Sequence, residues 1–419
     1  MDSVAKPVPQ RVLSVDVLRG LTIALMILVN DPGDWNHVYT QLDHAPWNGF
    51  TLTDFVFPNF LFLVGASIVF SLQSRIAKGN CNVTLSLHIV RRAAALFAIK
   101  MFLTAFPHFH WTHLRIFGVL TRIAVCYLAA GLICVGVWKM KRRVTVLLAI
   151  IAALLVGYWV LMRFVPVPGF GVPTHAMPIL DPDRNLAAWL DRAFNAFTQR
   201  TIHTGTLYNH TRDPEGLLST LPAVATTLIG CVAGFWLSLK KEPVPAFVTE
   251  RYPNAGSFST AIVLVAASVL SLVAGLIWNV WFPINKNLWT SSYVLFAAGW
   301  SLLLLALCYW LMDVRRMNER PAGRLLLWPW LVLGSNAIIA FVLSNFIVEV
   351  MLWIKVPAGA LVNPANPGQR ISAWLWSYRH IFARHESTGV TSLAFALAFT
   401  ALCFLPNWIF WRRKIFLKV

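Results

Sequence analysis

The 419-residue chain is too apolar for a water-soluble domain, since 58% of its residues are hydrophobic and only 12% are charged, whereas an average soluble domain has about 25% charged residues. The formal net charge of +18 would suit a nucleic-acid partner, but the basic residues stand beside apolar runs and form no single basic face. We therefore exclude an ordinary soluble domain and expect no nucleic-acid partner. We predict an all-α, polytopic membrane bundle that forms one domain over residues 1–419.

Apolar runs of roughly 20 residues predict the helices, because a helix of that length crosses the about 30 Å hydrocarbon core of a bilayer. We predict ten spans, at residues 13–30, 52–73, 87–106, 114–137, 144–165, 217–238, 258–280, 289–312, 325–352 and 389–411. Two long loops, 166–216 and 353–388, separate the later spans. In the first of them, DPDRNLAAWLDRAF predicts a short surface helix with an Asp start.

The basic residues predict the orientation of the spans. Most of them precede span one, follow spans two, four, six and eight in short loops, or close the chain. Because Lys and Arg in short loops favour the cytoplasmic side, we expect both termini to be cytoplasmic. The loop at 31–51 and the two long loops would then lie on the far side. In a bacterium this would be the inner membrane.

Polar side chains are concentrated between Arg11 and Ser67, which covers span one, a loop and the start of span two. Asp16 and Arg19 share one helical face and form either a structural ion pair or a cationic site for a cytoplasmic anion. Asn30, at the far-side end of span one, is either a helix cap or an amide donor to an oxyanion. His44 is either a surface residue or a general base.

Other polar groups lie at the far-side ends of later spans. Asp213 and Glu215 precede span six and either begin its helix or form an acidic patch for a cationic substrate. Asn285 and Lys286 precede span eight, and they either cap the entry to its helix or help to receive a substrate. The histidines at 108, 110 and 113 have a metal-like spacing, but no acidic or thiol ligand lies near them in the sequence, so we predict no metal site.

Together these segments resemble the heparan-α-glucosaminide N-acetyltransferase family and its bacterial relatives. The matching residues fall within Ser14–Gly20, Val29–Asn30, His44–Gly49, Asp54–Pro58, Gly118–Arg122, Asp213–Gly216, Asn285–Val294, Gly334–Asn336 and Lys414–Phe416. The resemblance implies transfer of acetyl from cytoplasmic acetyl-CoA to the amine of a terminal glucosamine on the far side, by a homodimer in membrane lipid. The functional His of the family corresponds to His44, and its active-site Asn corresponds to Asn30.

From the positions of the polar residues in the predicted spans, we infer a role for each of them in such a transfer. His44 would accept the proton of the acceptor amine, and Asn30 would hold the thioester oxygen or orient the acceptor, while Asp43 or Asp54 would orient the imidazole. We expect direct transfer, with an acetyl-His44 intermediate as the alternative. The acceptor side would comprise Trp47, Asn48, Asp213, Glu215, Asn285 and Lys286, and the CoA side Asp16, Arg19 and Arg122.

Differences from the family's lysosomal member broaden the expected acceptors to a smaller amino sugar or the end of a cell-wall glycan. Ser344 and Asn345 stand where that member has a His-Glu pair. Two other functions fit the chain. Ten spans with buried charges suit an amino-sugar transporter, although no two-fold repeat or matched pair of broken helices is visible. Membrane O-acyltransferases share the Asp-x-x-Arg-Gly pattern of span one.

Overall fold

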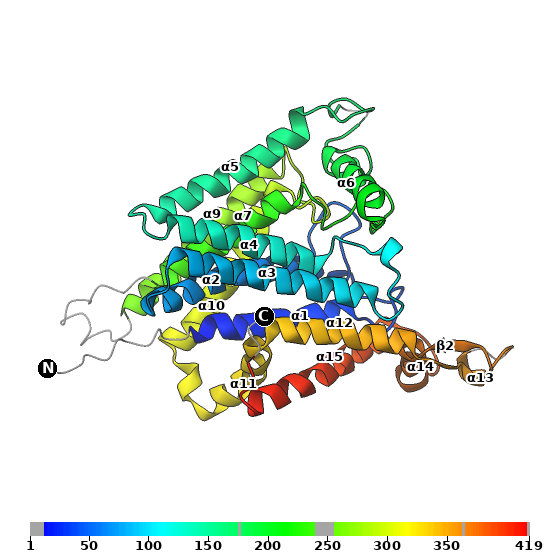
Figure 1. Ribbon diagram of the computed structural model, residues 1–419. Coiled ribbons are helices and arrows are strands. Elements are labelled where there is room, and N and C mark those ends of the chain that lie inside the picture. Colours follow the sequence, from blue (N-terminus) through cyan, green and yellow to red (C-terminus); the bar gives the residue numbers. More distant parts are fainter. Residues whose placement is uncertain (1–11, 175–176, 239–254, 363–364, 417–419) are drawn as a thin grey trace.

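The computed structural model describes residues 12–174, 177–238, 255–362 and 365–416, which form a bundle of helices (Figure 1). The all-α prediction is confirmed. The long helices are α1 (Leu13–Asn30), α2 (Leu52–Ala77), α3 (Asn82–Ala105), α4 (Val119–Val137), α5 (Arg143–Phe164), α7 (Thr220–Ser238), α9 (Ala255–Trp278), α10 (Ser291–Tyr309), α11 (Pro321–Ser335), α12 (Ala337–Trp353) and α15 (Gly389–Arg412). The other helices are α6 (Leu186–Ile202), α13 (Gly359–Val362) and α14 (Ala373–Ser377), and the strands β1 (Lys355–Pro357) and β2 (Arg370–Ser372) form an antiparallel pair.

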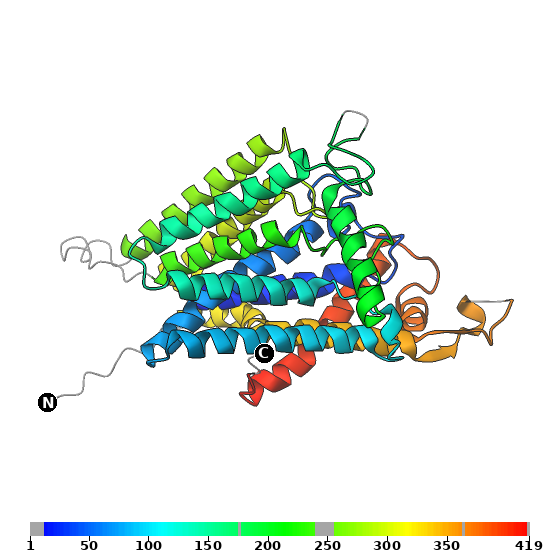
Figure 2. The same ribbon diagram turned by 45° about the horizontal axis from the view of Figure 1, so that its top comes forward.

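Most of these helices suit a membrane. Within the described residues, eight helices are each long and apolar enough to cross a bilayer, and α11 and α12 together would add a ninth, broken span. The remaining expected span corresponds to α3, which is more polar because it carries Arg91, Arg92 and Lys100. Helix α3 nevertheless lies beside α4 within the bundle (Figures 1 and 2). The chain is therefore built as a multi-pass integral membrane protein.

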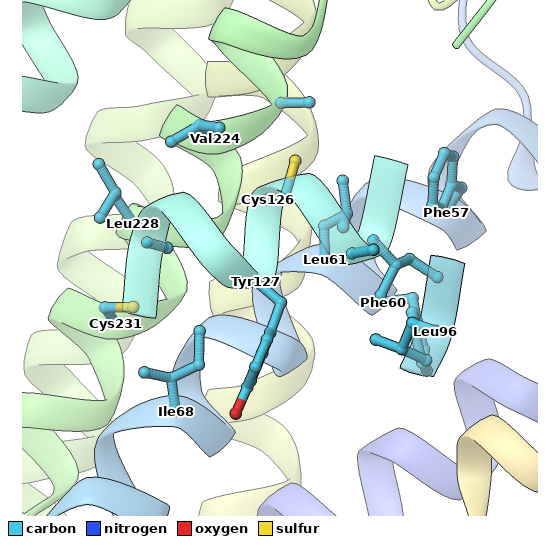
Figure 3. Close-up of a cluster of buried hydrophobic side chains, with 14 of the residues drawn as sticks. Phe57, Phe60, Leu61, Ile68, Leu96, Cys126, Tyr127, Val224, Leu228 and Cys231 are labelled. Atoms are coloured by element: carbon cyan, nitrogen blue, oxygen red, sulfur yellow. The ribbon is translucent and has the colours of Figure 1, made fainter. Parts of the chain in front are cut away.

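The core lies where α2, α4 and α7 meet, and Figure 3 shows apolar side chains of these helices filling the space between them. Helices α2 and α7 approach very closely through two glycines. A Cβ atom on Gly65 would lie 1.9 Å from the carbonyl oxygen of Thr227, and one on Gly230 would lie 1.9 Å from that of Phe62. Small residues allow such close backbone packing between membrane helices.

The expected span at 325–352 is not one continuous helix, because the chain breaks at Asn336 and α11 and α12 meet at 76°. Two features accompany the break. The Arg19 guanidinium donates to the carbonyl oxygen of Gly334 (3.2 Å), and the Asn336 amide donates to that of Ile415 (3.0 Å). Polar side chains thus bond backbone groups near the break, as broken helices in membranes require. Both halves are apolar, so hydropathy gave no sign of the break.

The polar loops collect at one end of the bundle, which we call the loop end. The loops at 31–51 and 279–290, helix α6 and the β1–β2 hairpin all lie there (Figures 1 and 2). The shared position of loop 31–51 and the two long loops agrees with the sequence. The predicted surface helix is α6, but it begins after Asn185, whose side chain accepts from the Ala188 N–H, and not at an Asp.

Candidate functional site

His44 and Asp54 meet at the loop end through the local structure at the start of α2. Thr51 and Asp54 form a capping box, in which each side chain accepts from the backbone N–H of the other. This cap turns the carboxylate of Asp54 back toward the preceding loop. Its Oδ1 lies 2.9 Å from Nδ1 of His44, and its Oδ2 accepts from the Ala45 N–H at 3.0 Å.

Burial separates the roles of these two side chains. The carboxylate of Asp54 is only 1% exposed, whereas the imidazole of His44 is 46% exposed. Because Nδ1 faces the buried acid, Nε2 is the nitrogen left for a reacting molecule. A neutral imidazole that donates its Nδ1 proton to a carboxylate carries a lone pair on Nε2. The pair can therefore act as a general base at the edge of the bundle.

Asp43 has a different function from Asp54. Its Oδ1 accepts from the backbone N–H of His44 at 2.7 Å and so holds the backbone of His44 and not its imidazole. Of the two acids that the sequence offered as partners of the imidazole, the structure places Asp54 against it. Tyr293 of α10 holds the backbone of Asp54, since its hydroxyl donates to the Asp54 carbonyl oxygen at 2.7 Å. Nothing in the sequence indicated this contact.

Lys286 also belongs to this cluster. Its Nζ lies 3.0 Å from His44 Nδ1 and 3.4 Å from Asp54 Oδ1. The neighbouring Asn285 is fully buried, and its amide donates to the Trp47 carbonyl oxygen (2.9 Å) and to the Asn48 side chain (3.1 Å). Asn285 and Asn48, both expected on the acceptor side, thus hold the two loops of the site together.

Trp47 is likewise engaged within the protein. Its indole N–H donates to the Leu180 carbonyl oxygen at 2.9 Å, and the Arg212 guanidinium lies 4.9 Å from its ring centroid. The ring thereby connects the loop that carries His44 with the long loop before α7. An acceptor could still reach one edge of the indole, because the residue is only partly buried.

Asn30 lies at the end of α1 with an exposed side chain. Within the described residues, no hydrogen bond joins it to His44. A small pocket adjoins this helix end and is lined by Val29, His37 and Tyr39, with Ser392 of α15 opposite. Asn30 is followed by Asp31, whose burial raises its pKa to about 7.

Asp213 and Glu215 do not form an open acidic patch. Arg115 donates to both oxygens of Asp213 (2.7 and 2.6 Å) and to Glu215 (2.5 Å). Burial alone would lower the pKa of Arg115, but the two carboxylates raise it above its ordinary value. The side chain of Asp213 is fully inaccessible. The acids do not begin α7 either, because that helix starts at Thr220 and has no acid in its first turn. They form part of an internal ion pair with Arg115.

Arg122 does not lie beside Arg19, contrary to the expected CoA-side position. It is in the first turn of α4, is 1% exposed, and donates to the Gly216 carbonyl oxygen (3.1 Å) and the Ser219 hydroxyl. Its guanidinium lies 4.9 Å from the ring centroid of Trp289. Residue 122 comes only three positions after α4 begins, which places it near the loop end.

Asp16 and Arg19 form the expected ion pair (3.1 Å) toward the opposite end of α1. Arg19 also donates to the Ser67 hydroxyl of α2 (2.7 Å) as well as to the carbonyl at the α11–α12 break. This pair is about 16 Å along α1 from Asn30, at 1.5 Å per residue. Arg19 thus joins three helices, α1, α2 and α11.

Comparison with known proteins assigns the family. Residues 11–255 match the family model described as heparan-alpha-glucosaminide N-acetyltransferase, catalytic. The chain belongs to this family. Heparan-alpha-glucosaminide N-acetyltransferase of Mus musculus is 29% identical over 366 residues, which are 79% of this chain and 53% of the mouse protein. The Homo sapiens protein is 28% identical over 371 residues, 80% and 52% of the two chains. The chain thus spans about half the length of these relatives. The matched range contains His44 and Asp54.

Proposed function

We propose that the chain is a membrane N-acetyltransferase that moves acetyl from cytoplasmic acetyl-CoA to the amine of a glucosamine-type sugar at the loop end. The observation that carries the proposal is the His44–Asp54 pair. A buried carboxylate holds Nδ1 of an imidazole whose other edge is exposed, in a chain of the heparan-α-glucosaminide N-acetyltransferase family.

The chemistry needs a base and a donor to the oxyanion. The amine nitrogen attacks the thioester carbonyl carbon, its proton passes to Nε2 of His44, and the C–S bond breaks as the tetrahedral adduct collapses. Nε2 then returns the proton to the departing thiolate sulfur. Asp54 stabilises the imidazolium between these steps, and the exposed Asn30 amide can donate to the oxyanion. We favour this direct route over an acetyl-His44 intermediate.

The remaining assignments are part of the same proposal. Asp16 and Arg19 would face the donor side, so Arg19→Gln should raise the KM for acetyl-CoA and leave the KM for the amine unchanged. Trp47, with its partly exposed ring, would contact the acceptor. We also propose a homodimer, which the mass of the purified protein in nanodiscs tests.

The decisive experiment measures labelled acetyl transfer from acetyl-CoA to glucosamine by purified protein, with N-acetylglucosamine as the blocked acceptor. His44→Ala should lower turnover by about 10²-fold or more while acetyl-CoA binding persists. His385→Ala, which changes an exposed histidine at the same end, is the matched control. Near-normal turnover in His44→Ala would refute the site. Product from the blocked sugar would indicate O-acyl transfer, and label trapped on His44 without acceptor would indicate the covalent route.

The broken span supports a second candidate function. Transporters often place discontinuous helices at their substrate sites, and the α11–α12 break is one such element. An amino-sugar transporter would catalyse counterflow of glucosamine in liposomes that lack acetyl-CoA. The N-acetyltransferase should instead yield acetylated product only when acetyl-CoA is present.

A further inference from the structure

Lys286 makes contacts that acceptor binding does not require. The residue lies in the loop between α9 and α10, and its side chain is only 18% exposed. Its Nζ approaches His44 Nδ1 (3.0 Å) and Asp54 Oδ1 (3.4 Å) from inside the protein. The ammonium group is therefore directed at the buried side of the imidazole and away from the exposed edge where an acceptor would bind.

The loop that carries Lys286 is held rigidly. The Asn285 side chain accepts from the Leu288 N–H at 2.9 Å, and the Thr290 hydroxyl accepts from the Asn285 N–H at 3.0 Å. The Gly49 N–H donates to the Ile284 carbonyl oxygen at 2.9 Å, which fastens this loop to the one that contains His44. These hydrogen bonds within and between the two loops hold Nζ of Lys286 at its distance from the imidazole of His44.

The two neighbours of Nδ1 require opposite states of that nitrogen. An ammonium group can only donate and a carboxylate can only accept. When Nδ1 donates to Asp54, Nε2 carries the lone pair and can act as a base. Lys286 then finds no acceptor at Nδ1, and its charge acts on the ring instead. After Nε2 has taken the amine proton, the ring is an imidazolium, and the nearby ammonium disfavours this second charge and so promotes release of the Nε2 proton to the thiolate.

We infer that Lys286 is a positioning residue of the proposed acetyl transfer that acts through His44: Asp54 keeps the Nδ1 proton in place, and the Lys286 ammonium promotes release of the proton from Nε2 to the thiolate. The inference rests on the proposed function. The charged groups that face Lys286 are His44 in its loop, Asp54 on α2 and Glu215 before α7. Burial lowers the pKa of Lys286, although Asp54 and Glu215 act to raise it. An ammonium that close to Nδ1 also opposes a second positive charge on the ring.

The test compares Lys286→Met with Lys355→Met, a lysine at the same end whose ammonium donates to the Leu352 carbonyl oxygen. Lys286→Met should lower kcat about tenfold or more and change the KM for glucosamine by no more than about twofold. Its acidic limb in the pH–rate profile should move to higher pH by about one unit, because a nearby cation disfavours protonation of the ring. Lys355→Met should leave all three unchanged.

Rescue provides a second measurement. Lys286→Cys treated with bromoethylamine regains an ammonium at the same position and should recover much of the lost kcat. Wild-type protein treated in the same way is the control, since Cys81 is exposed and will also react. If Lys286→Met is not folded, the comparison of Lys286→Cys before and after this reaction decides the question.

Two results would overturn the inference. An unchanged kcat and pH limb would show that Lys286 is irrelevant to His44. A rise confined to the KM for glucosamine would make Lys286 an acceptor-binding residue instead. Failure of the proposed function is separate, because wild-type protein would then acetylate no amino sugar at all.

Discussion

The imidazole of His44 and the carboxylate of Asp54 lie 2.9 Å apart across ten residues of sequence, and only the acid is buried. A carboxylate in this position keeps the Nδ1 proton in place and stabilises the charged ring. Asp43 is next to His44 in the sequence but bonds the backbone N–H. The two acids can therefore be told apart by their effects on turnover.

Asp54→Asn should lower kcat by about 10²–10⁴-fold, because an amide at this position can no longer stabilise the imidazolium. The measurement is acetylated glucosamine formed at saturating acetyl-CoA. Asp43→Asn is the matched control and should change kcat no more than about twofold. Equal losses of kcat in the two variants would indicate that Asp54 supports the loop and does not act through its contact with the imidazole.

The fold could be predicted from the sequence where the signal is local. Apolar runs located nearly every long helix, since burial in lipid requires each span to be apolar by itself. The break at Asn336 could not be predicted, because the donor from Arg19 comes from more than 300 residues away. Helix α3 was predicted as a span although it is less apolar than the others. It carries three basic residues and still packs in the bundle.

The candidate site could be predicted only in part for the same reason. The family resemblance selected His44, and the spacing of Thr51 and Asp54 suits a cap. The approach of Lys286 to His44 joins residues 242 positions apart, and no periodic pattern encodes such a contact. The surroundings of Arg122 could not be predicted either, since the sequence located its helix but not the groups around the first turn of that helix.

Arg115→Leu should destabilise the protein by about 3–5 kcal/mol, because it leaves the buried carboxylate of Asp213 without its partner. Thermal unfolding in detergent measures the effect. Arg184→Leu, which removes an exposed partner of Asp181, should cost at most about 1 kcal/mol. If Arg115→Leu instead kept its Tm and raised only the KM for glucosamine, Asp213 would belong to the acceptor site.

Gly230→Ala should destabilise the contact between α2 and α7 by about 1–3 kcal/mol. The added Cβ would lie 1.9 Å from the carbonyl oxygen of Phe62, so the helices must separate. Gly157→Ala in α5 is the control, since no atom lies within 4 Å of the position of its Cβ, and better helix propensity should raise Tm slightly. Equal Tm changes in the two variants would contradict close packing at Gly230.

Asp31→Asn should stabilise the protein more at pH 8 than at pH 5. Burial raises the pKa of Asp31 from 3.8 to about 7, so between these values the folded state binds more protons at this group than the unfolded state. Its contribution to stability therefore falls as the pH rises from about 4 to about 7, and the full penalty applies above that range. An asparagine carries no such penalty at any pH.

The measurement is the difference in Tm between Asp31→Asn and wild type at pH 5, 6, 7 and 8. The difference should grow with pH and level off only above about pH 8, where Asp31 is nearly fully ionised in both states. Glu386→Gln, which changes an exposed acid at the same end, should give a difference that does not vary with pH. A constant difference for Asp31→Asn as well would mean that water reaches the carboxylate despite its position against the helix end.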